Sequence, residues 1–278
     1  MNKIGIMQGR IFPERLDKFQ IFPVSNWKDE LTKIEEMGFN CVELLFDKKL
    51  VLEKLLADFE KFKSLGIKPN NKKNGFIAKS ICIDYFSSVS ILNPEMEHFF
   101  YDKIIKIIDT INNTTIDVLV IPLLDVNSVT LKNDFQFVLN WIEERKLDEI
   151  AHRNNIILAL ELDLPADQIR SVFIKHSFNN IAICYDLGNA RAAGNFPEEE
   201  IIMLDDFIAH VHIKDRKVNG PNVMLGEGDV NFVECFKSLK KIGYDGQIIL
   251  ETSYNNSPID EAKKNFEFIQ NIISGAIS

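Results

Sequence analysis

The sequence predicts an α/β protein: a (β/α)8 TIM barrel that forms a single domain over residues 1–278. Short apolar segments alternate with amphipathic segments eight times, without a composition break or a linker. Apolar strands that alternate with helices indicate a parallel sheet covered by helices. Eight units favour a closed barrel, a fold that commonly takes about 250 residues. An open dinucleotide-binding sheet is less favoured, because no GxGxxG sequence follows the first strand.

In the first half of the chain, helix stops and apolar spacing define the elements. Leu31, Ile34 and Met37 share one helical face, and Gly38 follows as a stop. Pro94 suits the first turn of a helix. Strands are expected at 3–8, 40–45, 77–84 and 117–122, and helices at 27–37, 50–65 and 95–111 and along a stretch that ends near 153.

The second half repeats the same alternation. Strands are expected at 156–161, 181–186, 208–213 and 247–251. Helices are expected at 166–175, 198–205, 232–241 and 260–273, with a glycine-containing loop between residue 186 and the helix that begins at 198.

Composition limits the partners and the compartment. The net charge of −9 argues against nucleic acid, which needs a basic surface. The four cysteines are widely spaced and form no CxxC pair, so a zinc site built from them is not expected. No apolar run approaches the roughly 20 residues of a membrane span, and no signal peptide is recognisable. We therefore expect a cytoplasmic protein with a small-molecule substrate and no membrane partner.

Polar residues end four successive strands. In the strand at 208–213, His210 and His212 alternate with apolar residues and so point to one face. Glu161, Asp186 and Glu251 end the other three strands. The active site of such a barrel lies at the carboxyl ends of its strands. The sequence therefore predicts that Glu161, Asp186, His212 and Glu251 converge.

These four side chains offer three carboxylates and one imidazole. Three carboxylates that meet in a partly dry site repel one another unless a cation neutralises them. Carboxylate-rich ligands with one imidazole suit Mn²⁺, Mg²⁺ or Co²⁺, and also Zn²⁺. We expect one divalent metal ion here.

Several short motifs, in this order, resemble the sugar isomerase/epimerase superfamily with the xylose isomerase-like TIM barrel. They are Ile4–Arg10 (IGIMQGR), Val42-Glu43, Ala159–Glu161 (ALE), Tyr185–Asn189 (YDLGN), His210–Asp215 (HVHIKD), Leu225–Asp229 (LGEGD) and Leu250-Glu251. The resemblance covers essentially the whole chain and implies that the four residues above bind the metal. It also implies that Glu161 and Glu251 form a proton-transfer pair, acting on a sugar or sugar phosphate through a metal-stabilised enediolate.

Two departures from the ketose 3-epimerase pattern point away from a free ketohexose. Asn189 stands where those enzymes carry histidine, and Val218 stands where they carry arginine, with Arg216 nearby. Lys214 and Arg216 belong to a basic loop that suits a phosphate or another anionic group. The expected substrate contacts are Gln8, Arg10, Glu43, Asp84, Asn189, His210, Lys214, Arg216 and Glu227, and His210 is alternatively a hydrogen-bonded core residue.

Other functions remain open on the same barrel. A metal-dependent dehydratase (a lyase) of a cyclic polyol or related keto compound would use the same enolate chemistry, so only its products would separate it from an isomerase. A non-catalytic sugar-binding barrel is a further alternative. An endonuclease of the abasic-site type would need more histidines than these five and a basic face. The sequence leaves isomerase and epimerase undecided, and a homo-oligomer is compatible with it.

Overall fold

The computed structural model describes residues 3–12, 21–47, 77–112, 114–254 and 256–277. The helix expected at 50–65 lies outside the described residues. Among the described residues, no helix is long and apolar enough to cross a lipid bilayer.

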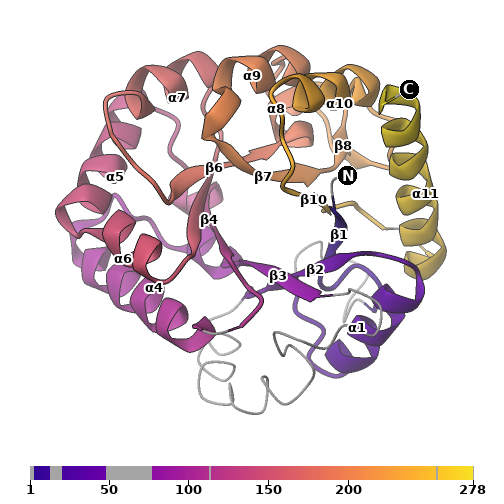
Figure 1. Ribbon diagram of the computed structural model, residues 1–278, viewed down its shortest axis with the longest axis horizontal. Coiled ribbons are helices and arrows are strands. Elements are labelled where there is room, and N and C mark those ends of the chain that lie inside the picture. The colour runs from indigo at the N-terminus through magenta and orange to yellow at the C-terminus, as the bar shows by residue number, and fades with distance from the viewer. Residues whose placement is uncertain (1–2, 13–20, 48–76, 113, 255, 278) are drawn as a thin grey trace.

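Eight parallel strands close into a barrel, and the described helices surround it (Figure 1). The ring closes because β1 pairs with both β2 and β10. The barrel strands are β1 (Lys3–Met7), β2 (Cys41–Leu45), β3 (Ile77–Cys82), β4 (Val118–Leu123), β5 (Ile157–Leu162), β6 (Ile181–Asp186), β7 (Ile208–Ile213) and β10 (Gln247–Leu250). The predicted (β/α)8 TIM barrel is confirmed, and the strand predictions are accurate to within two residues.

The helices follow the expected alternation, with two differences. They are α1 (Trp27–Glu36), α4 (Glu97–Ile111), α5 (Lys132–Glu144), α6 (Leu147–Arg153), α7 (Ala166–Phe173), α8 (Leu187–Ala192), α9 (Pro197–Leu204), α10 (Phe232–Lys241) and α11 (Pro258–Ile277). The stretch ending near 153 is two helices, because Lys146 takes a left-handed conformation with φ of 56°. The loop expected after residue 186 begins as α8, since the Asp186 carboxylate accepts a hydrogen bond from the Asn189 amide.

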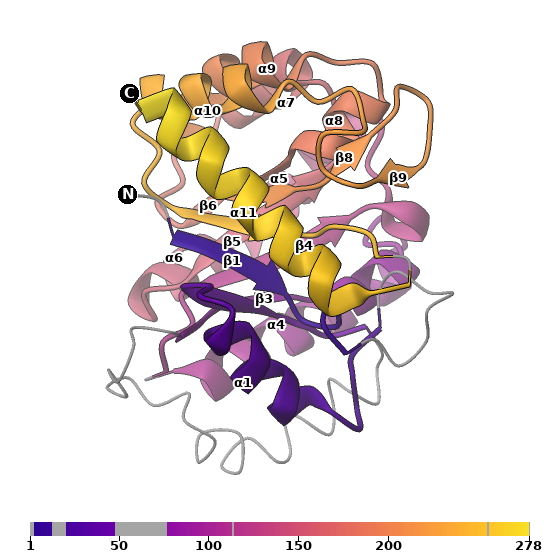
Figure 2. The ribbon, with the colours of Figure 1, turned by 90° about the vertical axis from the view of Figure 1, so that its right-hand side faces the viewer.

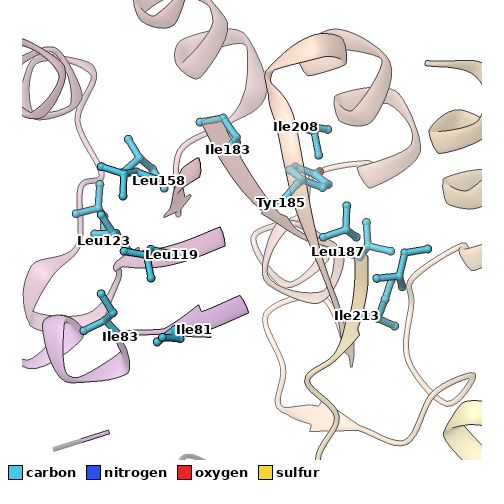
Figure 3. Packing of buried hydrophobic residues seen from close by; sticks show 14 of the residues in the cluster. Ile81, Ile83, Leu119, Leu123, Leu158, Ile183, Tyr185, Leu187, Ile208 and Ile213 are labelled. Carbon is cyan, nitrogen blue, oxygen red and sulfur yellow. The ribbon is translucent and has the colours of Figure 1, made fainter. Parts of the chain in front are cut away.

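Two apolar layers hold the barrel. The outer layer lies between strands and helices, and Figure 3 shows part of it, including Leu119, Leu158 and Ile213. The inner layer fills the barrel with small and medium side chains, as expected for a barrel that is a packed core and not a pore. Its buried members are Met7, Cys41, Leu45, Cys82, Val118, Val120, Ala159, Cys184 and Ile249. Three of the cysteines therefore pack inside the barrel, Cys235 on α10 packs in the outer layer, and all four are free thiols.

Loops at the carboxyl ends of the strands build the functional face. A short antiparallel pair, β8 (Asp215–Arg216) and β9 (Asn222–Val223), lies at the end of the barrel to which the strands point (Figure 2). After β3 the chain turns into a 3₁₀ helix over Asp84–Ser88, so the expected strand ends two residues early, at Cys82.

Gly5 on β1 lies where side chains of β2 and β10 come very close. A Cβ atom at this position would lie 2.6 Å from Cys41 Sγ and 2.6 Å from Ile249 Cδ1. We expect Gly5→Ala to lower the free energy of unfolding by about 1–3 kcal/mol, because the packed interior cannot yield without moving β2 or β10. Urea unfolding would measure this, and Gly275→Ala, where a Cβ meets no atom within 4 Å, is the control. Equal stability of the two variants would contradict the tight packing.

Candidate metal centre and active site

Four polar side chains from four neighbouring strands meet above the inner apolar layer. Glu161 lies on β5, Asp186 ends β6, His212 lies on β7 and Glu251 directly follows β10. Each offers one ligand atom, and these atoms all lie within 4.8 Å of one another. All four residues are at least 95 % buried. The structure thus brings together the four residues that the sequence pattern singled out.

The Nε2 atom of His212 contacts a carboxylate that comes from across the ring. Glu43 on β2 contacts both histidines of β7: its Oε1 lies 2.9 Å from His212 Nε2, and its Oε2 lies 2.7 Å from His210 Nε2. All three side chains are fully buried. Glu43, expected as a substrate contact, and His210, expected as a substrate contact or a hydrogen-bonded core residue, contact each other in this structure.

Glu43 contacts both histidines and so forms a bridge between them, here called the Glu43 bridge. This bridge determines which His212 nitrogen can act as a ligand. Burial raises the pKa of Glu43, but His212 and His210 lower it further, so that it stays below its ordinary value and the group is an anion. An anionic Glu43 accepts the proton of His212 Nε2 and leaves Nδ1 facing Glu251 Oε2 at 3.0 Å and Glu161 Oε1 at 3.7 Å. A carboxylate behind an imidazole in this way orients it and makes it more basic toward a metal.

Cationic side chains lie among the acids. Lys214 Nζ is 2.9 Å from Asp186 Oδ2 and 3.1 Å from Glu251 Oε1, and Arg10 Nη2 is 3.9 Å from Glu251 Oε1. Burial raises the pKa of Glu251, but Lys214, His212 and Arg10 lower it to about 2. For Asp186 burial outweighs the ion pair with Lys214 and raises the pKa to about 6.

Asn189 and Arg216 form a chain of contacts that ends at Glu161. Arg216 Nη1 donates to Asn189 Oδ1 at 3.0 Å, and Asn189 Nδ2 donates to Glu161 Oε1 at 3.5 Å. Arg216 also donates to the carbonyl oxygen of Gly220. Of these two predicted substrate contacts, Asn189 thus contacts Glu161 directly, and Arg216 contacts it through Asn189.

Glu30 holds the loop after β1, a role that the sequence analysis missed. Its fully buried carboxylate accepts hydrogen bonds from the backbone amides of Gly9, Ile11 and Phe12. This loop carries Arg10, which is 1 % exposed. The available signal was an acid on the apolar face of α1, four residues before the buried Ile34.

The remaining predicted residues, Gln8, Asp84 and Glu227, are not members of the four-residue cluster. Gln8 is fully buried, and its Oε1 accepts from the Leu45 amide at 3.4 Å. Asp84 begins the 3₁₀ helix after β3, and Glu227 is exposed on a turn. That turn is held by Asp215, another residue the sequence analysis missed, whose carboxylate accepts from the amides of Gly226, Gly228 and Val230.

The four-residue cluster fits a divalent cation. His212 Nδ1 is buried, and although Glu251 Oε2 lies 3.0 Å from it, no described donor or acceptor meets this atom with hydrogen-bond geometry. A buried polar atom without such a partner is unusual. When it is unprotonated, this nitrogen and the carboxylate oxygens around it form a donor set of the kind that Mn²⁺, Mg²⁺, Co²⁺ or Zn²⁺ accepts.

A family model described as a xylose isomerase-like TIM barrel matches residues 31–272. The chain belongs to this family. L-ribulose-5-phosphate 3-epimerase UlaE of Escherichia coli is 36% identical to this xylose isomerase-like barrel over 109 residues, which are 37% of this chain and 38% of the relative. The first curated relatives are thus matched over less than half of their own length.

Solved structures share the fold over the whole chain. An L-ribulose 3-epimerase superposes with a TM-score of 0.73 at 16% identity, covering 99% of this chain and 96% of that chain. A xylose isomerase-like barrel from Mycobacterium smegmatis, solved in complex with magnesium, superposes with a TM-score of 0.74 at 16% identity, covering 100% and 98%. At this identity the likeness establishes the shared barrel.

Replacing Glu43 tests how His212 is oriented. We expect Glu43→Gln to weaken Mn²⁺ binding about 10- to 100-fold, because a neutral amide no longer fixes the proton on His212 Nε2. Isothermal titration of chelator-treated protein would measure this. Glu36→Gln on α1, whose side chain is 60 % exposed, should bind Mn²⁺ like the unmodified protein. Equal affinities for Glu43→Gln and Glu36→Gln would show that the bridge does not orient the ligand.

Asp84 should make stability depend on pH. Burial, with Glu251 and Glu161, raises its pKa from 3.8 to about 7. A raised carboxyl pKa means that the folded state holds the proton more tightly, so stability is lost as pH rises from about 4 through 7. In the presence of a chelator, Asp84→Asn should be more stable than the unmodified protein at pH 8, by on the order of 2 kcal/mol, and equal to it at pH 4. Urea unfolding at both pH values is the measurement, and a pH-independent difference would contradict this assignment.

Proposed function

We propose that this protein is a divalent-metal-dependent isomerase or epimerase of a ketose or ketose phosphate. The observation that carries the proposal is the convergence of Glu161, Asp186, His212 and Glu251, with two glutamates on non-adjacent strands of the ring. Moving a carbonyl, or inverting the carbon beside it, requires removal of a weakly acidic proton. Two carboxylates on different sides of one substrate meet that requirement.

Each residue then has a distinct role. Glu161 and Glu251 hold and return the proton at the carbon beside the carbonyl, while Asp186 and His212 complete the cation's ligands. A divalent cation held by these residues would polarise the substrate carbonyl and would stabilise the negative charge that develops when the proton leaves. Asn189, fixed by Arg216, keeps Glu161 in place, and the Glu43 bridge does the same for His212.

The substrate class is supported by a relative and by local charge. The matched E. coli relative is named as an epimerase of L-ribulose 5-phosphate. Arg10 lies beside Glu251, and Arg216 reaches Glu161 through Asn189, and a guanidinium group suits the binding of an anionic group. L-ribulose 5-phosphate is therefore the first compound to test, followed by unphosphorylated ketoses and inososes.

Deuterium uptake tests the proposal directly. The unmodified protein, with Mn²⁺ and L-ribulose 5-phosphate in D₂O, should exchange the hydrogen beside the substrate carbonyl for deuterium. NMR would measure the rate of this exchange. Glu161→Gln and Glu251→Gln should each lower the exchange rate about 10²- to 10⁴-fold, because each amide can no longer take up a proton. Chelation should abolish exchange and added Mn²⁺ should restore it.

The control and the product separate the alternatives. Glu149→Gln on α6, 60 % exposed in its side chain, should exchange like the unmodified protein. Inversion at the exchanging carbon identifies an epimerase, a shifted carbonyl identifies an isomerase, and loss of water identifies a dehydratase. Exchange at the unmodified rate in both glutamine variants would rule out the proton-transfer pair.

A further inference from the structure

Lys214 is the least expected neighbour of the four-residue cluster. The sequence analysis assigned it to a basic loop that faces an anionic substrate group, yet it is only 5 % exposed. Its ammonium group lies between Asp186 Oδ2, at 2.9 Å, and Glu251 Oε1, at 3.1 Å. Lysine is almost never this buried unless it is paired. Its contacts are therefore with two of the residues that would bind the metal.

The alternation of β7 explains this position. His210, His212 and Lys214 are two residues apart, so all three point into the barrel when the extended chain continues past the end of β7 at Ile213. The ring therefore places an imidazole and an ammonium group side by side at its carboxyl end. The lysine is part of the strand pattern.

Space for the lysine is left by Gly188 in α8. A Cβ at residue 188 would lie 2.3 Å from Lys214 Cγ and 2.9 Å from the Lys214 carbonyl oxygen. Real Cβ atoms essentially never come this close to other atoms, so a larger residue at 188 would push the lysine stem away. The YDLGN sequence thus supplies both a carboxylate, Asp186, and the opening that lets Lys214 reach it.

Charge balance gives the lysine a function. Glu161, Asp186 and Glu251 bring three negative charges into a buried volume, and a divalent cation offsets only two. Lys214 offsets the third through direct contacts, while Arg10 lies farther from Glu251, at 3.9 Å. Buried charges that are left unbalanced cost several kcal/mol each.

We propose that Lys214 is a resident cation of the metal centre, which stabilises the metal-free protein and moderates its affinity for the divalent ion. It does so by balancing Asp186 and Glu251. The metal half of this inference rests on the proposed function, whereas the stability half does not. Because the ammonium group and a divalent ion held by Asp186 and Glu251 would be like charges at the same carboxylates, the lysine would weaken metal binding while it keeps the ligands together.

Replacing the lysine separates these effects. In chelator-treated protein, Lys214→Met should lower Tm by at least about 5 °C, because two buried carboxylates lose their partner. The same variant should bind Mn²⁺ about tenfold more tightly by isothermal titration. Lys217→Met removes a half-exposed lysine paired with Asp229 in the same loop, and it should change neither quantity.

A double variant distinguishes charge from packing. Adding Glu251→Gln to Lys214→Met removes one of the orphaned charges, so the metal-free double variant should have a higher Tm than Lys214→Met alone. If Lys214→Met does not fold without metal, added Mn²⁺ or the second substitution should restore folding. Failure of both to restore it would overturn the proposal.

Two other results would also overturn it. An unchanged Tm and unchanged Mn²⁺ affinity in Lys214→Met, with only a raised KM for a sugar phosphate, would show that the lysine serves the substrate. Weaker Mn²⁺ binding in that variant would show that the lysine assists the metal. If the unmodified protein binds no divalent ion, the proposed function fails, while the Tm values of the metal-free variants still decide whether Lys214 balances the carboxylates.

Discussion

The mutual repulsion of three buried carboxylates is the constraint on which this site depends. Glu161, Asp186 and Glu251 come from β5, from the end of β6 and from just after β10, and each is at least 95 % buried. Carboxylates this close cannot all stay ionised without positive charge nearby. The surroundings supply it in different ways: as the ammonium group of Lys214, as the guanidinium group of Arg10, and as a cation that the site is suited to bind.

In two loops, a buried carboxylate is stabilised by hydrogen bonds from backbone amides. Glu30 collects three amides of the loop that carries Arg10, and Asp215 collects three amides of the turn at 226–230. Both acids are buried, and both convert a flexible connection into one fixed by charge-assisted hydrogen bonds. Rigid loops matter here because ligand atoms must hold their positions to within about half an ångström.

The barrel and the four ligands were predictable because they rest on local periodicity. Apolar strands alternate with helices along the chain, and residues two apart on a strand share a face, as at His210 and His212. What could not be predicted depends on contacts between distant strands. Glu43 on β2 contacts His212 on β7 across the ring, and the sequence of neither strand indicates that the two residues are in contact.

Lys214 shows a different limit. The alternation that places His210 and His212 inward also places Lys214 inward. A lysine just after a strand is usually solvated, however, so the sequence analysis assigned Lys214 to a basic loop. The decisive fact is the opening at Gly188, which only the folded chain shows. Likewise, the left-handed residue Lys146 divides a helical stretch whose amphipathic pattern gives no sign of a break.

One of the two departures from the ketose 3-epimerase pattern, Asn189, is in direct contact with Arg216. Asn189 replaces a histidine of that pattern, and its amide has one acceptor and two donor hydrogens, so its orientation must be fixed by a neighbour. Arg216, two residues before the position of the missing arginine, donates to the amide oxygen and thereby turns the amide nitrogen toward Glu161. With a histidine at 189, Arg216 would face a second cation or a weaker acceptor. Asn189 and Arg216 thus act as one hydrogen-bonded unit, in which Arg216 fixes the amide that donates to Glu161.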